Sequence, residues 1–434
     1  MNPEAPWQFI TRRQILQSLA AAGGCALLPS KLLSAASWQA RNGDEAFLDD
    51  LERQGCLFFW EQASPTTGQV LDRARNDLGG SRDPRRMASI AATGFGLTAL
   101  CVADNRGYLP HAQIVERVRN TLDWHLNKFP EIHGFYYHFS DIETGERVRG
   151  VELSSIDTSL LLCGILSARA YFEDPKIKSL ATQIYERVDW PWMLNGGKTF
   201  SMGWHPGEGF IDARWEHFCE LMMIYLLAIG SPTHPVPGDY WKNWTRPVIH
   251  YKDFTYISGN DPIFTHQYSH AWFDFRNKRD DYANYFENSI TATEAHKAFC
   301  LSYPKWYNED YWGISASDYK DGYTAWGGPP AQGPIDGTVV PCASAGSLAF
   351  VPTNCISVLR AMRDKWGKQA WGRYGFVDAF HPAANWYDTD VLGIDQGISV
   401  LMAENLRTGM IWNTFMRNPE AKAAMQRAGF HTAA

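Results

Sequence analysis

Residues 154–172 have the sequence SSIDTSLLLCGILSARAYF, a short polar start followed by a run that is apolar on almost every side. A helix with apolar residues all around it is buried rather than laid on a surface. The same pattern recurs at four other places, residues 89–103, 214–230, 353–366 and 393–409. The sequence therefore predicts a set of buried helices, each entered from a short polar or Gly/Pro-containing segment.

Amphipathic stretches lie between these runs, at residues 46–63, 111–129 and 175–192. Inner helices surrounded by outer ones form an (α/α) toroid, so the fold class expected here is all-α. Strand signals are sparse, and the short runs at 134–140 and 198–204 predict β-hairpins at the rim, among long loops. No linker or low-complexity segment interrupts the chain. We therefore expect a single domain over residues 41–434.

The composition excludes some classes of function. The chain of 434 residues carries a net charge of −7, so it offers no basic surface for nucleic acid. Its balance of 45% apolar and 20% charged residues is that of an ordinary globular protein. The unusual feature is 18 tryptophans, many of them in a Gly- and Pro-rich segment at 189–330. A sugar ring presents an apolar face to aromatic side chains, so this segment suggests a carbohydrate-binding groove.

The N-terminal segment resembles an export signal. Arg12 and Arg13 precede a weakly apolar run and then small residues, the pattern of a bacterial twin-arginine signal over residues 1–40. That run is too short to span a bilayer, and no later segment qualifies. The sequence therefore predicts a periplasmic or secreted protein without a membrane span. A lipid anchor at Cys25 is the less favoured alternative.

Carboxylates inside apolar helical runs are the informative chemical feature, because a buried charge is costly unless it is paired or protonated. Glu220 lies in such a run, where burial would raise the pKa of its carboxyl and suit a general acid. Glu216 is placed one turn earlier on the same expected helix. A buried ion pair with Arg214 or another arginine explains Glu220 equally well.

Asp157 and Asp395 stand near the starts of two other inner helices, where a helix cap is the simpler explanation. If the inner helices run parallel, their starts meet at one end of the toroid. Two opposed carboxylates at such a place are what glycoside hydrolysis requires, one to protonate the leaving oxygen and one to activate water or attack.

Two other patterns support no cofactor. The segment GFGLTA from Gly94 fits a loose dinucleotide-binding pattern, but a helix-like stretch precedes it, so it indicates close helix packing. His266 and His270 are four residues apart without a third ligand, and hydrogen bonding explains them better than a metal does. We expect neither metal nor cofactor.

Seven ordered motifs resemble those of bacterial glucoamylase-like proteins, a group that includes the endo-β-1,2-glucanases of glycoside hydrolase family 144. These motifs are LLLCGILSARAYF, YLLAIGSPTHP, FTHQYSHAWFDFR, YWGISASDYKDGY, DGTVVPCASAGSLAF, WGRYGFVDAFHP and GIDQGISVLMAENLRTGMIW. The resemblance covers roughly residues 47–430. It implies an (α/α)6 toroid, an exported enzyme that needs no metal, and inverting hydrolysis by two carboxylates. The motifs at IDTS and GIDQGIS depart from better-studied members, which bears on the linkage that is cleaved.

By position in these motifs, Glu220 is the expected general acid, Asp395 the expected base and Asp157 its competitor. The expected substrate-binding residues are Trp204, His205, Trp215, Glu216, His266, Tyr268, His270, Trp312, Asp318, Tyr323, Trp326 and Trp386. The function that follows is endo-acting hydrolysis of β-1,2-glucan by a monomer, with an oligo- or polysaccharide as the partner. The alternatives are a non-hydrolytic glycan-binding protein and a transglycosylase or lyase on the same scaffold.

Overall fold

The computed structural model describes residues 39–259 and 262–433. The predicted export signal, apart from its last two residues, lies outside them, as does Cys25. Within these two ranges, no helix combines the length and the apolar character that crossing a bilayer would require.

Helices make up most of the regular structure. They are α2 (Asp44–Glu61), α3 (Ile90–Asn105), α4 (His111–Asn127), α5 (Ser155–Tyr171), α6 (Pro175–Glu186), α7 (Trp190–Leu194), α8 (Met222–Gly230), α9 (Tyr268–Trp272), α10 (Tyr285–Leu301), α11 (Pro341–Ala345), α12 (Pro352–Ala370), α13 (Gly393–Arg407), α14 (Met410–Phe415) and α15 (Pro419–Arg427), with 3₁₀ turns η1 (Gly238–Lys242), η2 (Ile263–His266) and η3 (Pro382–Ala384). Local signals start several of them: Ser89 and Ser154 accept a hydrogen bond from the first turn of α3 and α5, and Asp174 does so for α6.

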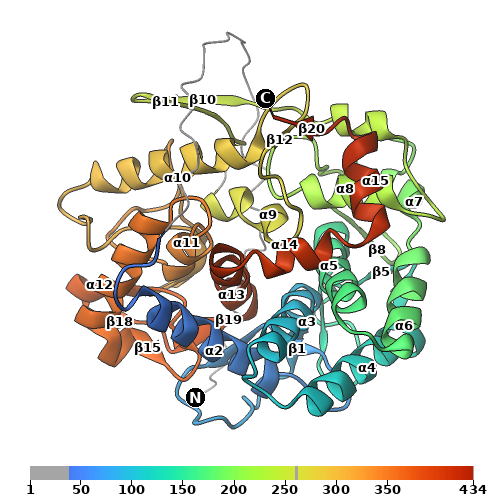
Figure 1. The fold of residues 1–434 in the computed structure, drawn as a ribbon, viewed down its shortest axis with the longest axis horizontal. Coiled ribbons are helices and arrows are strands. Elements are labelled where there is room, and N and C mark those ends of the chain that lie inside the picture. Colours follow the sequence, from blue (N-terminus) through green and yellow to red (C-terminus); the bar gives the residue numbers. More distant parts are fainter. Residues whose placement is uncertain (1–38, 260–261, 434) are drawn as a thin grey trace.

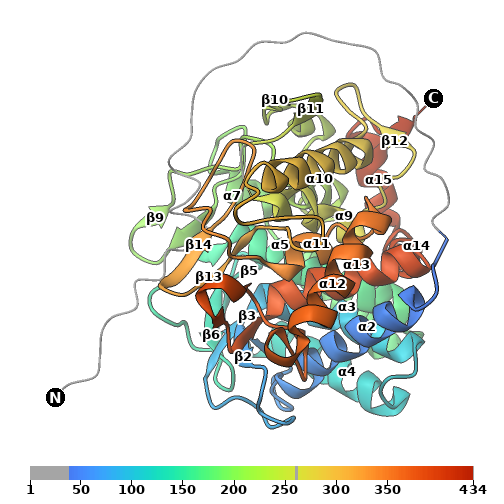
Figure 2. The same ribbon diagram turned by 90° about the vertical axis from the view of Figure 1, so that its left-hand side faces the viewer.

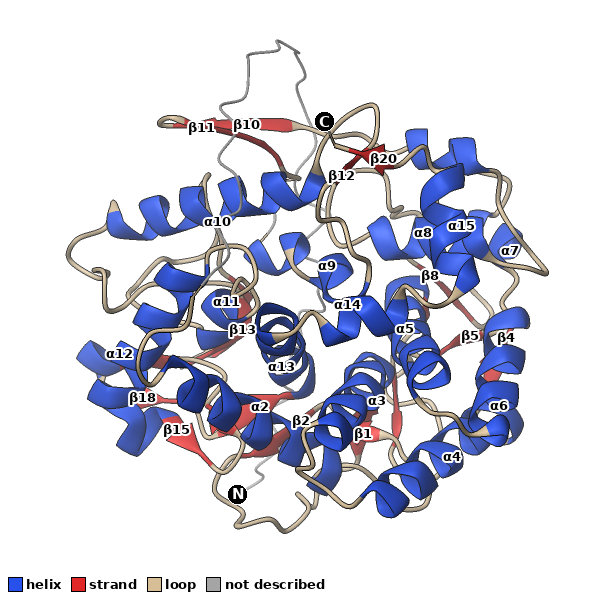
Figure 3. Ribbon diagram, in the orientation of Figure 1, coloured by secondary structure: helices blue, strands red, loops and turns tan. Residues whose placement is uncertain are grey.

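Buried helices lie at the centre of the molecule and amphipathic ones around them. Figure 1 shows α3, α5, α9 and α13 near the middle and α2, α4, α6, α10 and α12 at the periphery. Figure 3 shows the same division, with short strands between the helices. Nearly every residue of α3, α5 and α13 is buried, whereas α4 and α6 bury one face each. The expectation of inner and outer helices in a helix-rich fold is confirmed.

Two of the expected inner helices differ from prediction. Helix α12 buries one face and exposes the other, because its apolar residues are interrupted by Arg360, Arg363 and Lys365, and it lies at the periphery. The run at 214–230 becomes helical only from Met222 onward. Before that point the main chain bonds to other segments: the Trp215 N–H donates to the carbonyl of Phe200, and the Glu216 carbonyl accepts from the N–H of Thr245.

The strands are short and pair mostly as hairpins. They are β1 (Val70–Leu71), β2 (Arg73–Arg75), β3 (Met87–Ser89), β4 (Glu131–Ile132), β5 (Phe135–Tyr136), β6 (Phe139–Asp141), β7 (Leu153–Ser154), β8 (Gly203–His205), β9 (Gly209–Phe210), β10 (Val248–Tyr251), β11 (Phe254–Ile257), β12 (Lys278–Arg279), β13 (Ala316–Tyr319), β14 (Gly322–Ala325), β15 (Trp371–Gly372), β16 (Gly375–Phe376), β17 (Phe380–His381), β18 (Trp386–Tyr387), β19 (Asp390–Leu392) and β20 (His431–Thr432). The strands expected at 134–140 and 198–204 are present as β5, β6 and β8, the last of these beginning within the second run.

Several of these strands tie the starts of the central helices together. Strands β3, β7 and β19 lead directly into α3, α5 and α13. Strand β3 pairs with β1 and β6, β19 pairs with β2, and Tyr137 bridges to Leu153 on β7. Figure 2 shows β2, β3, β6, β13 and β14 gathered on one side of the helices. The starts of α3, α5 and α13 are therefore held at one end of the molecule.

One large cluster of buried side chains runs through the described chain from Phe47 to Phe430. This cluster contains most of the tryptophans of the segment 189–330, which the sequence suggested for a groove lined by loops. The buried tryptophans of the segment 189–330 are Trp190, Trp215, Trp241, Trp244, Trp272, Trp312 and Trp326. Most of these tryptophans therefore stabilise the core, and the expectation that they wall a groove is wrong for them.

Helices α3 and α5 approach each other unusually closely. A Cβ atom on Gly94 would lie 2.2 Å from the carbonyl oxygen of Leu160, and one on Gly164 would lie 2.0 Å from that of Gly94. Only residues without a side chain fit at this crossing. The interpretation of GFGLTA as a helix-packing motif is confirmed.

Candidate active site

Asp157, Glu220 and Asp395 lie at or just before the starts of three buried helices. Asp157 is in the first turn of α5, Asp395 is in the first turn of α13, and Glu220 lies two residues before α8. All three side chains are buried, with exposures of 3%, 6% and 1% for Asp157, Asp395 and Glu220. The indole N–H of Trp215 donates to Ser155 at 2.8 Å, so the segment that carries Glu220 is tied to the start of α5.

Asp157 belongs to a local hydrogen-bond system at the helix start. Ser154, not Asp157, is the N-cap of α5: its hydroxyl accepts from the Asp157 N–H and donates to the Asp157 carboxylate over 2.6 Å. His138 Nε2 lies 3.5 Å from the same carboxylate, and His138 Nδ1 lies 3.6 Å from Glu152. The Asp157 carboxylate thus orients the capping hydroxyl, whereas in a capping box it would accept from the main-chain N–H of the N-cap residue.

Glu220 lies where the chain leaves an irregular segment and enters α8. Its carbonyl accepts a hydrogen bond from the Ser269 hydroxyl, which also accepts from the N–H of Met223. Arg214, the ion-pair partner considered for it, donates instead to Thr199 and to the carbonyl of Leu194. Glu216 does not share a helical face with Glu220, because the chain is not helical there, and half of its side chain is exposed.

Asp395 faces a group of carboxyls that comes from several elements. Its carboxyl is hydrogen-bonded to that of Asp378, between β16 and β17. Carboxylate atoms of Asp318, Asp378 and Asp388 lie within 4.8 Å of one another. Burial raises the pKa of all three, and their mutual charges add to the effect: the pKa of Asp388 reaches about 7 and that of Asp378 lies well above its ordinary value. We call Asp318, Asp378, Asp388 and Asp395 the carboxyl cluster.

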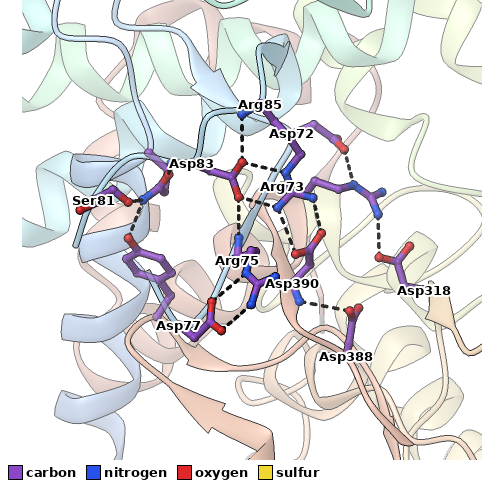
Figure 4. A network of polar contacts seen from close by, with 12 residues as sticks. Asp72, Arg73, Arg75, Asp77, Ser81, Asp83, Arg85, Asp318, Asp388 and Asp390 are labelled. Carbon is purple, nitrogen blue, oxygen red and sulfur yellow. Dashed lines mark hydrogen bonds and ion pairs between the residues drawn. The ribbon is translucent and has the colours of Figure 1, made fainter. Parts of the chain in front are cut away.

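Arg73 supplies the positive charge beside this cluster. Its guanidinium donates to Asp318 over 2.6 Å and to Asp72 over 3.0 Å, as Figure 4 shows. Figure 4 also shows Asp388 accepting a hydrogen bond from the main-chain N–H of Asp390. Asp390 in turn pairs with Arg85. The acidic side of the site is thus held in place by arginines from the segment around β2.

Oxygen ligands of the kind found in the carboxyl cluster suit a hard cation such as Ca²⁺. In the part of the chain that the structure describes, Asp318, Asp378 and Asp388 are the group with ligand-like spacing. Arg73 already neutralises Asp318, and the raised pKa of Asp378 favours a neutral carboxyl at that place. We therefore assign no metal to the cluster.

Apart from the exposed Glu216, the predicted substrate-binding residues divide into two sets by burial. Trp204, His205, Asp318, Tyr323 and Trp386 are half-buried and stand on short strands, namely β8, β13, β14 and β18. Trp204 packs against Trp192, and His205 Nδ1 lies 3.0 Å from the guanidinium of Arg147. These side chains retain surface with which a ligand can make contact.

The other set is in the core. His266, Tyr268, His270, Trp312 and Trp326 have at most 2% of their surface exposed. Burial lowers the pKa of His266 and His270 to about 3, so both stay neutral. Trp215 is buried as well, with its indole bound to Ser155. These residues pack in the core, and their contact with substrate stays a prediction.

Sequence reasoning missed Arg73, Asp378, Asp388 and His138. Asp378 stands in VDAFHP, between apolar residues, and the rule that singled out Glu220 would have found it had it been applied outside the predicted helices. Arg73, Asp388 and His138 carry no local signal, because only the folded chain brings them to Asp318, Asp378 and Asp157.

Comparisons with known proteins show what the chain is similar to. The family described as "Putative glucoamylase" matches residues 212–419. An exo β-1,2-glucooligosaccharide sophorohydrolase from Parabacteroides distasonis is 28% identical over 428 residues; the match covers 88% of this chain but only 58% of that relative. An endo-β-1,2-glucanase from Chitinophaga pinensis, solved with sophorotriose and glucose, is 28% identical with a TM-score of 0.83, over 90% of this chain and 99% of that one.

A helix-rich protein with buried carboxyls at the starts of its central helices is thus similar in sequence and in fold to β-1,2-glucan-active enzymes. A structure described as a glucoamylase from Bacteroides uniformis has a TM-score of 0.84 at 27% identity, over 91% of this chain and 99% of that one. The chain is similar to glucoamylase-like proteins, in agreement with its motifs.

Proposed function

We propose that this protein is a glycoside hydrolase that cleaves a glucan, with β-1,2-glucan as the preferred substrate. The observation that carries the proposal is the placement of Asp157, Glu220 and Asp395 at the starts of α5, α8 and α13, which hydrogen bonds and strand pairing hold together at one end. The solved relatives with this fold supply the linkage, since one is named as an endo-β-1,2-glucanase.

In the proposed mechanism Glu220 protonates the glycosidic oxygen and Asp395 activates a water molecule on the opposite face of the sugar. Direct attack by water inverts the configuration at the anomeric carbon and forms no covalent intermediate. Half-buried Trp204 and Trp386 offer apolar faces for sugar rings, and Asp318, Tyr323 and His205 offer groups that bind hydroxyls. The enzyme needs no cofactor in this scheme.

Substrate assays test the reaction class and the linkage. We expect new reducing ends with β-1,2-glucan and none with β-1,3-, β-1,4- or α-linked glucans. Chain-length analysis of early products separates endo action, which releases a range of sizes, from the sophorose release named for the relative from Parabacteroides distasonis. Binding of β-1,2-glucan without turnover would favour the glycan-binding alternative, and unsaturated products would identify a lyase.

The role of Glu220 has its own test. Glu220→Gln removes the transferable proton while keeping size and polarity, so turnover should fall by about 10²- to 10⁴-fold with little change in binding. Glu173→Gln is the control, because this exposed carboxylate pairs with Lys178 and should change turnover little. Equal losses in the two variants would contradict the assignment.

We further propose that residues 1–40 direct export by a twin-arginine-type route, that residues 41–434 form one (α/α)6 domain, and that the protein acts as a monomer in the periplasm or outside the cell. A reporter fused to residues 1–45 should leave the cytoplasm. In the double variant Arg12→Lys, Arg13→Lys the reporter should stay in the cytoplasm. Export of the double variant would overturn the proposed route.

A further inference from the structure

Asp378 is the most deeply buried member of the carboxyl cluster, with 4% of its surface exposed. Its main chain is fixed on both sides: the Asp378 N–H donates to the carbonyl of Asp390, and the carbonyl of Ala379 accepts from the N–H of Asp388. The carboxyl of Asp378 therefore stands at one defined place behind Asp395, where it has little freedom to move.

The two oxygens of Asp378 have different surroundings. Oδ2 accepts a hydrogen bond from the Asp318 N–H over 2.8 Å. Oδ1 is buried and accepts no hydrogen bond from a donor within the described residues. The same carboxyl is hydrogen-bonded to the carboxyl of Asp395. Two carboxyl groups form a hydrogen bond only when one of them carries a proton.

The charges around Asp378 decide which group holds that proton. Asp318 on β13, Asp388 before β19 and Asp395 on α13 face it, and the charges of Asp72 and Asp390 act on Asp318. The cation within this group is Arg73, which donates to Asp318 and Asp72, not to Asp378. Burial, joined by the charge of Asp395, raises the pKa of Asp378 well above its ordinary value. Both effects favour the protonated form of Asp378.

Resting on the proposed function, we propose that Asp378 is a positioning residue that donates a proton-bearing hydrogen bond to Asp395. This bond fixes the orientation of the Asp395 carboxylate and keeps it unprotonated, in the form that accepts a proton from the attacking water. Asp378 itself touches neither water nor sugar in this scheme. During turnover the proton of the water passes to Asp395, and the proton on Asp378 stays where it is.

The geometry makes asparagine a faithful replacement. In Asp378→Asn the amide oxygen can accept from the Asp318 N–H, as Oδ2 does now, and the amide nitrogen can donate toward Asp395. Alanine offers neither contact. The pair Asp378→Asn and Asp378→Ala therefore separates a neutral hydrogen-bond donor from a negative charge and from simple loss of packing.

The central measurement is the pH dependence of kcat on β-1,2-glucan. We expect Asp378→Asn to keep kcat within about tenfold and the acidic limb of its profile at the wild-type pH. Asp378→Ala should lower kcat strongly and change KM less. The acidic limb of its profile should move to higher pH by about one unit or more, the size expected for loss of one hydrogen bond to a charged group. The inference is overturned if the Asn variant moves the limb to lower pH, because that would show removal of a negative charge. Identical behaviour of the two variants would overturn it as well.

Asp280→Asn is the matched control for lost stability. Asp280 is also buried, and its carboxyl accepts hydrogen bonds from Trp241, Tyr282, Ala283 and Tyr285, next to β12. The Asn variant should lower the midpoint of urea unfolding while leaving the acidic limb of the kcat profile in place. A shift of the limb in this variant would mean that the limb reports stability, and the inference would fall.

A second measurement is independent of turnover. Infrared difference spectra at neutral pH, wild type against Asp378→Asn, should show loss of the carbonyl band of a protonated carboxyl. Absence of that band overturns the inference even if the enzyme is active. If the protein cleaves no glucan but shows the band, the proposed function is wrong, whereas the assignment of a proton to Asp378 is supported. Calcium chloride that raises the Tm of the wild type but not of Asp378→Asn would show a cation in place of the proton, and the inference would fall.

Discussion

The guanidinium of Arg73 on β2 lies 2.6 Å from a carboxylate oxygen of Asp318 on β13, so that an ion pair joins two strands 245 positions apart in the chain. The same guanidinium reaches Asp72. Both partners of Arg73 are largely buried, and burial of an unpaired charge is costly. The free energy of unfolding should therefore depend on whether Arg73 is present to neutralise Asp318 of the carboxyl cluster.

Replacing Arg73 by methionine should destabilise the fold by about 3 kcal/mol or more, because Asp72 and Asp318 lose their cation. Urea unfolding at pH 7 measures the change. The double variant Arg73→Met with Asp318→Asn removes the stranded charge as well, so it should recover part of the loss. A double variant no more stable than Arg73→Met alone would show that packing of the long arginine side chain, not charge, is what Arg73 contributes.

The competition between Asp395 and Asp157 for the role of base is decided by comparing their Asn variants. Asp395→Asn should lower kcat by about 10²- to 10⁴-fold. Asp157→Asn disturbs the contacts with Ser154 and His138, so it should cost about 0.5–2 kcal/mol of stability, the range for helix-cap contacts. Its effect on kcat should be about tenfold or less.

Azide rescue separates the two roles, since a small anion can replace a missing base but not a missing helix contact. We expect azide to restore turnover to Asp395→Asn and not to Asp157→Asn. Rescue of the Asp157 variant alone would exchange the two assignments.

The architecture was open to prediction from local patterns, and the carboxyl cluster was not. Helices α3, α5 and α13 follow from apolar runs of helical length behind a polar residue, a signal carried by one short stretch of sequence in each case. The segment before Met222 looked equally helical, but its main chain bonds to Phe200 and Thr245, partners that no local pattern reveals. Aromatic residues near glycine and proline suggested a groove, yet tertiary packing buried most of the tryptophans.

Asp378 and Asp388 meet Asp318 and Asp395 only because strands from distant parts of the chain converge. Three separate segments, at 318, 378–388 and 395, contribute carboxyls to the cluster. Arg73, which contacts Asp318, belongs to a fourth segment. Each of these carboxylates alone resembles an ordinary loop or cap residue. Their chemistry depends on mutual distance, which sequence spacing does not contain.

Asp388 should make the stability of the protein depend on pH. Burial, with the charge of Asp318, raises the pKa of Asp388 from 3.8 to about 7, so the folded state binds a proton that the unfolded state has released. The contribution of this group to stability is fully present below about pH 4 and is lost as the pH rises to about 7. Asp388→Asn lacks that dependence. The free energy of unfolding of this variant, relative to wild type, should therefore increase by at least about 1 kcal/mol between about pH 4 and pH 8. That change corresponds to roughly one pKa unit after allowance for solvent screening.

Asp141 provides a control of opposite sign. Although burial acts to raise it, hydrogen bonds from Arg86 and from main-chain N–H groups hold the pKa of Asp141 at about 2. Stability from Asp141 is therefore present above about pH 4 and lost as the pH falls toward about 2. Asp141→Asn should be less stable than wild type at about pH 7, with the difference shrinking in acid. Parallel pH curves for both variants would contradict the two assignments.

The crossing of α3 and α5 should tolerate no added carbon. A Cβ atom on Gly164 would meet the carbonyl oxygen of Gly94 at 2.0 Å, and backbone on both sides leaves no flexible side chain to move aside. Gly164→Ala must push the helices apart, which should cost about 1–3 kcal/mol or more in urea unfolding. Because α5 carries Asp157 and its start is bonded to Trp215, kcat should fall as well.

Gly367→Ala on half-exposed α12 is the control for this prediction. The nearest neighbour of the added Cβ atom would be Arg363 Cγ at 3.6 Å, so helix propensity should stabilise that variant by up to about 1 kcal/mol. Equal effects at the two glycines would mean that the central helices are free to separate.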